Sequence, residues 1–392
     1  MGPELEAFRA EVRAFIADHA PPIPPRAGVR SAENEAELKS LQDWTARLFE
    51  AGYVGADWPA EFGGRDDRSA EHAIVVGEEL ARAAVPGVPS GSALASHALI
   101  HYGTDEQRRR HLPEIRAGRQ LWCQLFSEPG AGSDLASLRT RAVLDGDTYT
   151  VDGQKVWTTD GHWADYGYLL ARTDSDAPKH KGISAFILDM RSPGITVRPL
   201  RELTGTSDFN EVFFDSVEVP AEAMIGAPGQ GWAIANATLG HERTSVGAAV
   251  VKLRLAIDGL IDLAGRVTID GRPAIENARI RDRIGEFSAE VEALSALTYA
   301  NLTRWRRGTE RMHDGAMAKL MFSELNLEMA RFAIELGGEV GVLVEGDPDV
   351  LDGGRWQDEW LYARAYTIAG GSSEIMRNLI AERGLALPRD RR

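Results

Sequence analysis

The hydrophobic pattern of this chain changes its period twice, and that change limits the folds open to it. From residue 4 to about 119, apolar residues recur every three or four positions, as they do on one face of a helix. Between about 121 and 220, short segments rich in β-branched and aromatic residues alternate with turns. Helical patterns then return from about 229 to 383. The order predicts an α+β protein in which two helical regions flank a β region.

Three domains follow from these changes. We expect an N-terminal all-α domain at 1–120, a middle β domain at 121–225 and a C-terminal helical domain at 226–392. The C-terminal domain should be a four-helix bundle, because it holds four successive long helical patterns. These patterns cover 231–265, 276–306, 311–345 and 356–384.

The middle region predicts an antiparallel β sandwich or barrel. Its five clearest strand segments are Thr148–Val151, Tyr168–Arg172, Ser184–Leu188, Thr196–Pro199 and Glu211–Phe214. Turns separate them without intervening helical patterns, which argues against a Rossmann unit. The string nearest to a dinucleotide-binding loop has Leu135 where its third glycine belongs.

Composition narrows the classes of partner. With 44 basic and 59 acidic residues, the net charge is −15, which disfavours nucleic acid and anionic membranes as partners. Cys123 is the single cysteine, so a disulfide framework and a multi-cysteine metal site are excluded, and we expect it to be a small core residue. No apolar run is long enough for a membrane span. We therefore expect a cytoplasmic enzyme-sized protein without a metal.

The stretch from Gln124 to Asp134, QLFSEPGAGSD, concentrates polar chemistry at the start of the β region. Its glycines allow close approach of the backbone to a ligand, and its serine hydroxyls add donors. That combination suits a flat polar cofactor lying against a strand edge. The alternative is a tight surface turn.

This stretch resembles the flavin-binding signature of the acyl-CoA dehydrogenase family, and further motifs support the resemblance. Residues 153–161, GQKVWTTDG, are similar to the family's G-x-K-x-W-I-T-N-G. Residues 220–231 resemble the linker into the family's substrate helix, and 370–378, GGSSEIMRN, its C-terminal segment. The resemblance spans essentially the whole chain and implies the three-domain fold of the family with bound FAD.

The resemblance also assigns site residues. It implies that Trp157 packs against the flavin, that Thr159 hydrogen-bonds its ring, and that Ser133 also lies near the CoA moiety. Arg266 and Arg272 are both candidates for the FAD phosphates. The remaining residues implied to line the flavin are Gln124, Leu125, Phe126, Ser127, Gly132, Ser372 and Glu374. Glu128 is expected to be structural, bonding turn N–H groups.

The implied reaction is removal of the α proton of an acyl thioester with transfer of the β hydride to the flavin, and it needs a carboxylate base. Many family members carry that acid immediately before the glycine of the C-terminal motif, where this chain has Gly370 preceded by Ala369. Glu242 is the substitute candidate, because it lies on an apolar helical stripe and resembles the alternative location of the base. A bundle contact with Arg243 or His241 is the structural alternative.

Two neighbouring contacts complete the implied site. The backbone N–H of Gly370 could still donate to the thioester carbonyl, since that contact needs no side chain. Arg243 matches a position that contacts CoA in relatives, and an arginine suits phosphates or carbonyls.

The sequence leaves alternatives for the acyl group, for the binding partners and for the catalytic role of the chain. The expected substrate is an acyl-CoA or an acyl group on a carrier protein, with a branched, long or polycyclic chain. Relatives imply an electron-transfer flavoprotein as electron acceptor and a homotetramer or dimer. Because Gly370 lacks a carboxylate, a non-catalytic or half-site subunit of a hetero-oligomer is an alternative, as is a flavin monooxygenase or oxidase on the same scaffold.

Overall fold

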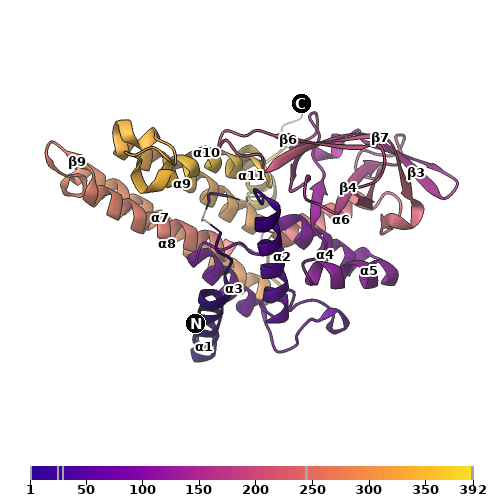
Figure 1. Ribbon diagram of the computed structural model, residues 1–392, viewed down its shortest axis with the longest axis horizontal. Coiled ribbons are helices and arrows are strands. Elements are labelled where there is room, and N and C mark those ends of the chain that lie inside the picture. The colour runs from indigo at the N-terminus through magenta and orange to yellow at the C-terminus, as the bar shows by residue number, and fades with distance from the viewer. Residues whose placement is uncertain (1, 24–25, 29–30, 243–245, 312, 390–392) are drawn as a thin grey trace. The chain divides into compact units, whose positions relative to one another are not determined.

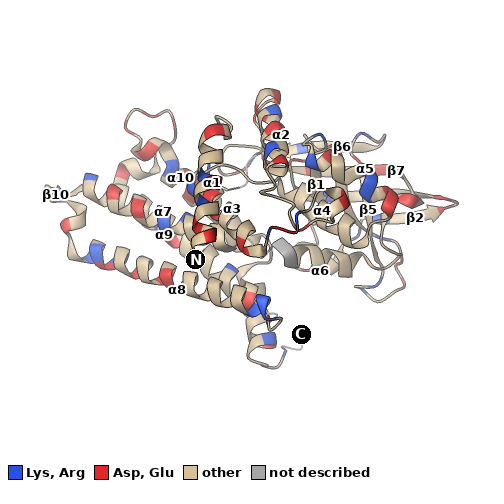
Figure 2. Cartoon of the chain, turned by 90° about the horizontal axis from the view of Figure 1, so that it is seen from below, with Lys and Arg blue, Asp and Glu red and all other residues tan. Residues whose placement is uncertain are grey.

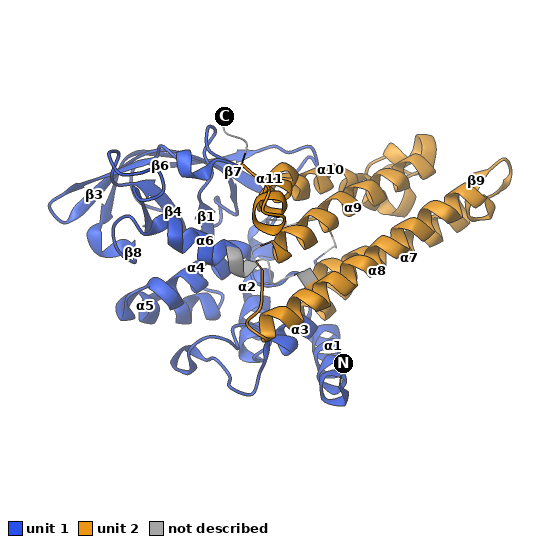
Figure 3. Cartoon of the chain, turned by 180° about the vertical axis from the view of Figure 1, so that it is seen from behind, with its two compact units in different colours: residues 1–23, 31–76, 85–242 blue, residues 24–30, 77–84, 243–392 orange. Residues whose placement is uncertain are grey.

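The computed structural model describes residues 2–23, 26–28, 31–242, 246–311 and 313–389, and at residues 240–242 and 246 it describes the backbone alone. Contacts divide the chain into two compact units, coloured separately in Figure 3. Unit 1 consists of residues 1–23, 31–76 and 85–242. Unit 2 consists of residues 24–30, 77–84 and 243–392.

The region before the strands is helical, as predicted (Figure 1). Its elements are α1 (Pro3–His19), α2 (Glu35–Glu50), the short 3₁₀ helix η1 (Ala60–Phe62), α3 (Ala70–Arg82), α4 (Ser90–Tyr102) and α5 (Asp105–Arg116). The side chain of Asn34 accepts a hydrogen bond from the N–H of Glu37 and so begins α2. Thr104 and Gln107 form a reciprocal capping box that begins α5.

The β region forms one eight-stranded sheet, in which β6–β7–β3–β2–β4–β5–β8 are successive neighbours and β1 pairs with β4. The strands are β1 (Trp122–Leu125), β2 (Arg141–Asp145), β3 (Thr148–Thr159), β4 (Tyr166–Arg172), β5 (Ile183–Asp189), β6 (Ile195–Leu200), β7 (Phe209–Pro220) and β8 (Met224–Ile225). Each of the five predicted strand segments falls within one of them. The expected antiparallel arrangement is wrong for two pairs, since β1 and β2 both run parallel to β4. About forty residues, including β2 and β3, connect β1 to β4, which is long enough for a parallel crossover.

Both faces of the central strands are buried, and successive side chains enter different cores. In β4, Tyr168 and Leu170 face a core shared with α4 and with α6 (Gly231–Glu242), whereas Leu169 and Ala171 face a core formed by the strands themselves. This burial explains why β4 and β5 read as continuous apolar runs instead of alternating ones. Cys123 lies in the strand core and is fully buried, as predicted.

Unit 2 is helical. Its helices are α7 (Val246–Arg266), α8 (Ala278–Arg306), α9 (Asp314–Gly337), α10 (Arg355–Ile368) and α11 (Ser373–Leu379), with the short strands β9 (Thr268–Ile269) and β10 (Arg272–Pro273) after α7. Helices α7 to α10 share one core, in which Leu260, Phe287, Met329 and Trp356 are buried. The predicted helical stretch 231–265 corresponds to two helices, α6 in unit 1 and α7 in unit 2.

The helices carry charged residues of both signs, in keeping with the 44 basic and 59 acidic residues of the sequence. In Figure 2, acidic and basic residues are interspersed along α8. Among the described residues, no helix is long and apolar enough to cross a bilayer. The same residues contain no group of three or more His, Cys, Asp or Glu placed to hold a metal ion.

Candidate functional site

The loop that follows β1 carries the predicted QLFSEPGAGSD site. Leu125 and Phe126 are almost fully buried, in the strand core and the helix-facing core respectively, while Gln124 is half-buried. Glu128 and Ala131 close a tight turn through two reciprocal main-chain hydrogen bonds of 3.1 and 3.0 Å. Leu125 therefore exposes no surface at this loop, and Phe126 exposes almost none.

Donor groups of the same loop are available to a ligand. Ser127 is half-buried, and Gly132 and Ser133 are exposed. In the described part of the chain, nothing accepts a hydrogen bond from the backbone N–H of these three residues. A Cβ placed on Gly132 would meet no atom within 4 Å, so the space beside it is open. Unpaired N–H groups facing open space suit an anionic or carbonyl-bearing ligand.

Trp157 stands out from β3 as an exposed aromatic ring. Tyr149, Val151 and Lys155 point inward with the period of two that a strand imposes, and Trp157 would be the next inward residue. A register shift against β7 between Lys155 and Thr158 interrupts this alternation. As a result Thr158 is buried, and Trp157 is 60% exposed with a left-handed φ of 60°.

This conformation is uncommon for a bulky residue, and it persists only where the surroundings impose it. The exposed indole lies edge-on to Phe209, with 6.0 Å between ring centroids. The neighbouring Thr158 hydroxyl is buried without a hydrogen-bond partner among the described residues, while the Thr158 carbonyl accepts a bond from Asn210. Thr159 is half-buried. A flat ligand fits against the exposed ring.

A buried ion pair joins the loop to β3. Lys155 is fully buried, and its Nζ donates to the carbonyl of Phe126 and to Oε1 of Glu128, both at 2.9 Å. The carboxylate of Glu128 also accepts hydrogen bonds from the N–H groups of Arg139 and Thr140, at 2.6 and 2.8 Å. Burial acts to raise the pKa of Glu128, but the ammonium of Lys155 and these hydrogen bonds outweigh it and lower the pKa. Glu128 thus bonds N–H groups as expected, although they lie beyond its own turn.

A second carboxylate, the half-buried Asp160, follows Trp157 by three residues. Its Oδ1 accepts a 2.6 Å hydrogen bond from the hydroxyl of Ser31, and Ser31 N–H donates to Asp208 at 2.8 Å. Burial raises the pKa of Asp160 to about 6; the Ser31 hydroxyl opposes this shift, and the Asp208 carboxylate adds to it. Burial also lowers the pKa of the nearby His162, which is bonded to Asn210.

The C-terminal motif lies in unit 2, after α10. Ala369 and Gly370 are exposed, Gly370 has a φ of 66°, and a Cβ on it would meet no atom within 4 Å. The hydroxyl of Ser372 accepts a bond from Ile375 N–H and begins α11. The carbonyl of Gly371 accepts a 2.5 Å bond from Lys319.

A hollow of about 360 Å³ borders this motif. Its lining includes the exposed Glu374 and the buried Ser373, whose hydroxyl has no hydrogen-bond partner among the described residues. An unsatisfied buried hydroxyl beside a hollow is a place where a polar ligand fits.

The remaining predicted residues are placed as follows. Arg266 ends α7 and pairs with Asp262 and Asp352, at 2.8 and 2.6 Å. Arg272 lies exposed in β10, so the choice between the two arginines stays open. Glu242 is the last residue of α6, but its side chain and the whole of Arg243 lie outside the described residues.

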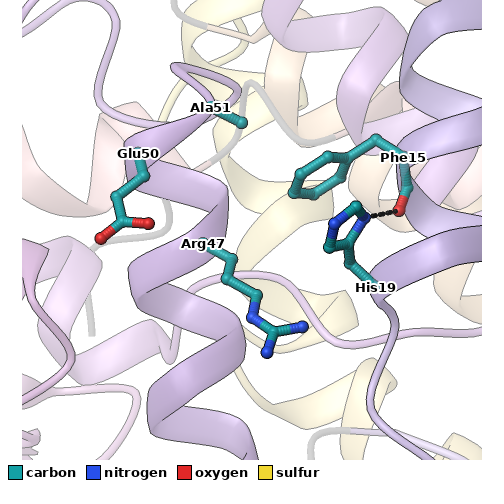
Figure 4. A pocket seen from close by; sticks show the side chains of 5 residues that line it. All are labelled: Phe15, His19, Arg47, Glu50 and Ala51. Carbon is teal, nitrogen blue, oxygen red and sulfur yellow. Dashed lines mark hydrogen bonds between the residues drawn. The ribbon is translucent and has the colours of Figure 1, made fainter.

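A larger hollow, of about 450 Å³, lies among the N-terminal helices and contains none of the predicted site residues. Figure 4 shows Phe15 and His19 of α1 side by side, across from Arg47 and Glu50 of α2. His19 is held by a 3.0 Å bond between its Nδ1 and the carbonyl of Phe15.

Family models match along almost the whole chain. The N-terminal, middle and C-terminal domains of acyl-CoA dehydrogenase match residues 2–119, 123–217 and 229–385. The chain belongs to the acyl-CoA dehydrogenase family. The predicted three-part architecture and enzyme class are therefore confirmed, and the family is one of flavoproteins.

Individual relatives agree with this assignment. The acyl-CoA dehydrogenase IpdE1 of Mycobacterium tuberculosis strain H37Rv is 38% identical over 394 residues, covering 99% of each chain. The solved structure of the Tcur3481-Tcur3483 steroid ACAD matches with a TM-score of 0.89 and 29% identity, covering 100% of this chain and 99% of that one. The ChsE4-ChsE5 complex of Mycobacterium tuberculosis matches with a TM-score of 0.85 and 30% identity, covering 100% and 99%.

Sequence interpretation missed two groups that shape the site, Lys155 and the Asp160–Ser31 contact. A signal for Lys155 was present, because it follows Tyr149 and Val151 on the inward face of a strand, where a buried lysine requires a carboxylate. No pattern could have paired Ser31 with Asp160, since 129 residues separate them.

Proposed function

We propose that this member of the family is an FAD-dependent acyl-CoA dehydrogenase that converts an acyl thioester to its α,β-enoyl thioester. The observations that carry the proposal all lie within unit 1: the exposed ring of Trp157, the bond from Val156 N–H to the carbonyl of Ser127, and the N–H groups of Ser127, Gly132 and Ser133, which have no acceptor among the described residues. These groups are the ones that the family resemblance assigns to the flavin and the thioester. FAD, when bound, would accept the hydride from the β carbon.

The α proton would go to the carboxylate of Glu242. The described residues of the C-terminal motif place no acid at 369–371, so the base has to come from another element. Helix α6 packs on the core that contains Phe126 of the loop after β1 (residues 126–134, here called the flavin loop), and Leu239, three residues before Glu242, lies against that core. The end of α6 therefore lies on the same side of the sheet as the loop. A carboxylate there can have a pKa tuned by burial, as proton removal from carbon requires.

Other residues would hold the substrate. The exposed backbone of Gly370 offers an N–H for the thioester carbonyl, where negative charge develops in the transition state. Arg243 would contact CoA, and Ser133 its thioester end. Ser372 and Glu374 would contact the flavin, as would Arg266 or Arg272 through its phosphates.

The acyl group that we propose is bulky and polycyclic. Support comes from one structural relative, the Tcur3481-Tcur3483 steroid ACAD, and from the proposed location of the base on α6. An electron-transfer flavoprotein would be the electron acceptor, in the cytoplasm. A panel of linear, branched and polycyclic acyl-CoA thioesters, compared by anaerobic bleaching of the flavin, ranks the substrates directly.

The base assignment is tested with Glu242→Gln. We expect the variant to keep its bound flavin. The rate of its anaerobic bleaching should fall by roughly a thousandfold or more, because general-base catalysis contributes about 10²–10⁴-fold to a rate. Glu218→Gln, which changes an exposed glutamate of β7, is the matched control and should bleach like the wild type. Undiminished bleaching by Glu242→Gln would show that another group removes the proton.

A half-site subunit of a hetero-oligomer is the second candidate. It is favoured by the missing carboxylate at Gly370 and by two structural relatives, the Tcur3481-Tcur3483 steroid ACAD and the ChsE4-ChsE5 complex, each of which is named for two components. The chain purified alone, examined for mass, flavin content and turnover, separates the two candidates. A homo-oligomer with stoichiometric flavin and turnover supports the complete enzyme, whereas flavin uptake only after adding a second subunit supports the half-site.

A further inference from the structure

Contacts of Lys155 and Val156, the two residues before Trp157, join the flavin loop to strand β3. Three contacts make the junction: the N–H of Val156 donates to the carbonyl of Ser127 at 2.9 Å, and Lys155 Nζ donates to Phe126 and to Glu128. The first contact fixes only one point of the loop. The lysine adds two more and reaches across the buried space between the segments.

The glutamate extends this junction to a third segment. Its two carboxylate oxygens take up the N–H groups of Arg139 and Thr140, which lead into β2. Close approach of this segment to β3 depends on Gly153, where a Cβ would lie 2.7 Å from the Cα of Thr140. The pair therefore connects the start of the loop, the lead into β2 and the strand β3.

Trp157 needs such support because its backbone is strained. A left-handed φ at a bulky residue costs of the order of 1–3 kcal/mol and is retained only when neighbouring contacts fix it. On the far side, Asn210 bonds the Thr158 carbonyl and Asp160 N–H donates to the Asp208 carbonyl at 3.2 Å. On the near side, the fixed point is Lys155. Without it, β3 could regain regular alternation, which would turn the indole inward.

We propose that Lys155 and Glu128 are positioning residues for the cofactor site, in which their buried ion pair holds the Trp157 ring outward and the N–H groups of the loop in place for the flavin. The inference rests on the proposed function for the identity of the ligand. A buried ion pair contributes little net stability compared with well-packed apolar residues, so its retention here is explained better by geometry than by stability.

The test compares Lys155→Met, the double variant Lys155→Met/Glu128→Gln and the control Lys179→Met. Lys179 forms an exposed ion pair with Asp134 of the same loop, so the control removes one ammonium from the same neighbourhood. Two quantities are measured on the apoprotein: the dissociation constant for added FAD, and amide hydrogen exchange at residues 126–134 and 156–160. Urea unfolding reports stability separately.

We expect Lys155→Met to lose both stability and FAD affinity, because it leaves the Glu128 carboxylate buried without its cation. The double variant removes both charges and should recover most of the stability. Its FAD affinity should stay about tenfold or more below that of the wild type, with faster exchange in both segments, since small displacements of a binding group are costly. The control should match the wild type in all three measurements.

If the Lys155–Glu128 ion pair only stabilises the fold, the measurements give a different result. A double variant that regains stability together with wild-type FAD affinity and exchange would overturn the inference while leaving the proposed function intact. If the wild-type chain takes up no flavin, the proposed function and the cofactor part of this inference are both overturned. Unchanged hydrogen exchange in the double variant would then overturn the positioning role of the ion pair as well. Should the double variant not fold, Glu128→Asp, which keeps both charges but shortens the acid, carries the same expectations for exchange and FAD affinity.

Discussion

Two carboxylates, the buried Glu128 bonded to Lys155 and the half-buried Asp160 three residues after Trp157, differ in what surrounds them. Glu128 has an ammonium at 2.9 Å and two backbone N–H donors, and its pKa is lowered. Asp160 receives a hydroxyl bond from Ser31, has no ion pair with a described cation, and has a pKa raised to about 6. Burial acts in the same direction on both acids. The nature of the partner therefore decides whether a buried acid here stays charged at neutral pH.

The two acids therefore support the strained backbone at Trp157 in different ways. Glu128 keeps its charge through the physiological range, while burial lowers the pKa of the Lys155 ammonium to about 8, so the ion pair is complete only below that pH. Asp160 can gain a proton near pH 6 and then resembles an amide. The family motif that the segment resembles has Asn where this chain has Asp160, so the neutral form of Asp160 is the one similar to relatives.

The largest expected effect comes from removing the carboxylate of Glu128, the acid that has a cation partner. Glu128→Ala should lower the free energy of unfolding by roughly 3–5 kcal/mol, because it leaves the ammonium of Lys155 buried without an acid. It also removes the acceptor for the N–H groups of Arg139 and Thr140. Urea unfolding monitored by circular dichroism measures the change.

Glu128→Gln is the companion variant. Its amide oxygen still accepts one backbone N–H, so its loss should be smaller than that of the alanine variant. A loss below about 1 kcal/mol in Glu128→Ala would contradict the view that this pair is a fixed junction.

The second prediction concerns Asp160, the acid that has no ion pair with a described cation. The folded pKa of Asp160, about 6, lies above its ordinary value of 3.8, so the folded state binds the proton more tightly. The free energy of unfolding should therefore fall as the pH rises from about 4 to about 7. Asp160→Asn removes this loss and should be more stable than the wild type at pH 8 by roughly 1–3 kcal/mol.

Melting temperatures at pH 5 and pH 8 check the sign. The gap between variant and wild type should be wide at pH 8 and narrow at pH 5, where Asp160 is mostly protonated. Asp215→Asn, at an exposed position of β7, should show no such gap. Equal pH dependence in Asp160→Asn and the wild type would mean that this acid is not a source of strain near Trp157.

Much of the architecture could be predicted from the sequence because it depends on local pattern. Helical periodicity, turn residues and β-branched segments placed the helical regions and the five named strands, although 231–265 and 356–384 each hold two helices, and the motifs identified the family. The parallel pairing of β1 with β4 could not be predicted, since it depends on which distant strand is adjacent and not on the composition of either strand.

The site was predicted as a set of residues but not as an arrangement. The motifs located Trp157 and the loop, yet its exposure arises from a register shift against β7, which no local signal revealed. Leu125 and Phe126, which were expected at the flavin, have their side chains in two different cores, and their place at the flavin remains a prediction. The role of Glu242 remains a prediction.

The smallest expected effect comes from an acid that is paired but exposed. Asp134 lies in the same loop as Glu128, and the ammonium of Lys179 lowers its pKa, assisted by a hydrogen bond from Ser137. Solvent screens this pair, so Asp134→Asn should change the free energy of unfolding by no more than about 0.5 kcal/mol. Urea unfolding at low salt and in about 1 M NaCl measures it, and the small difference should vanish at high salt, where the Debye length is near 3 Å. A loss comparable to that of Glu128→Ala would mean that a cation partner alone, without burial, makes a junction in this loop.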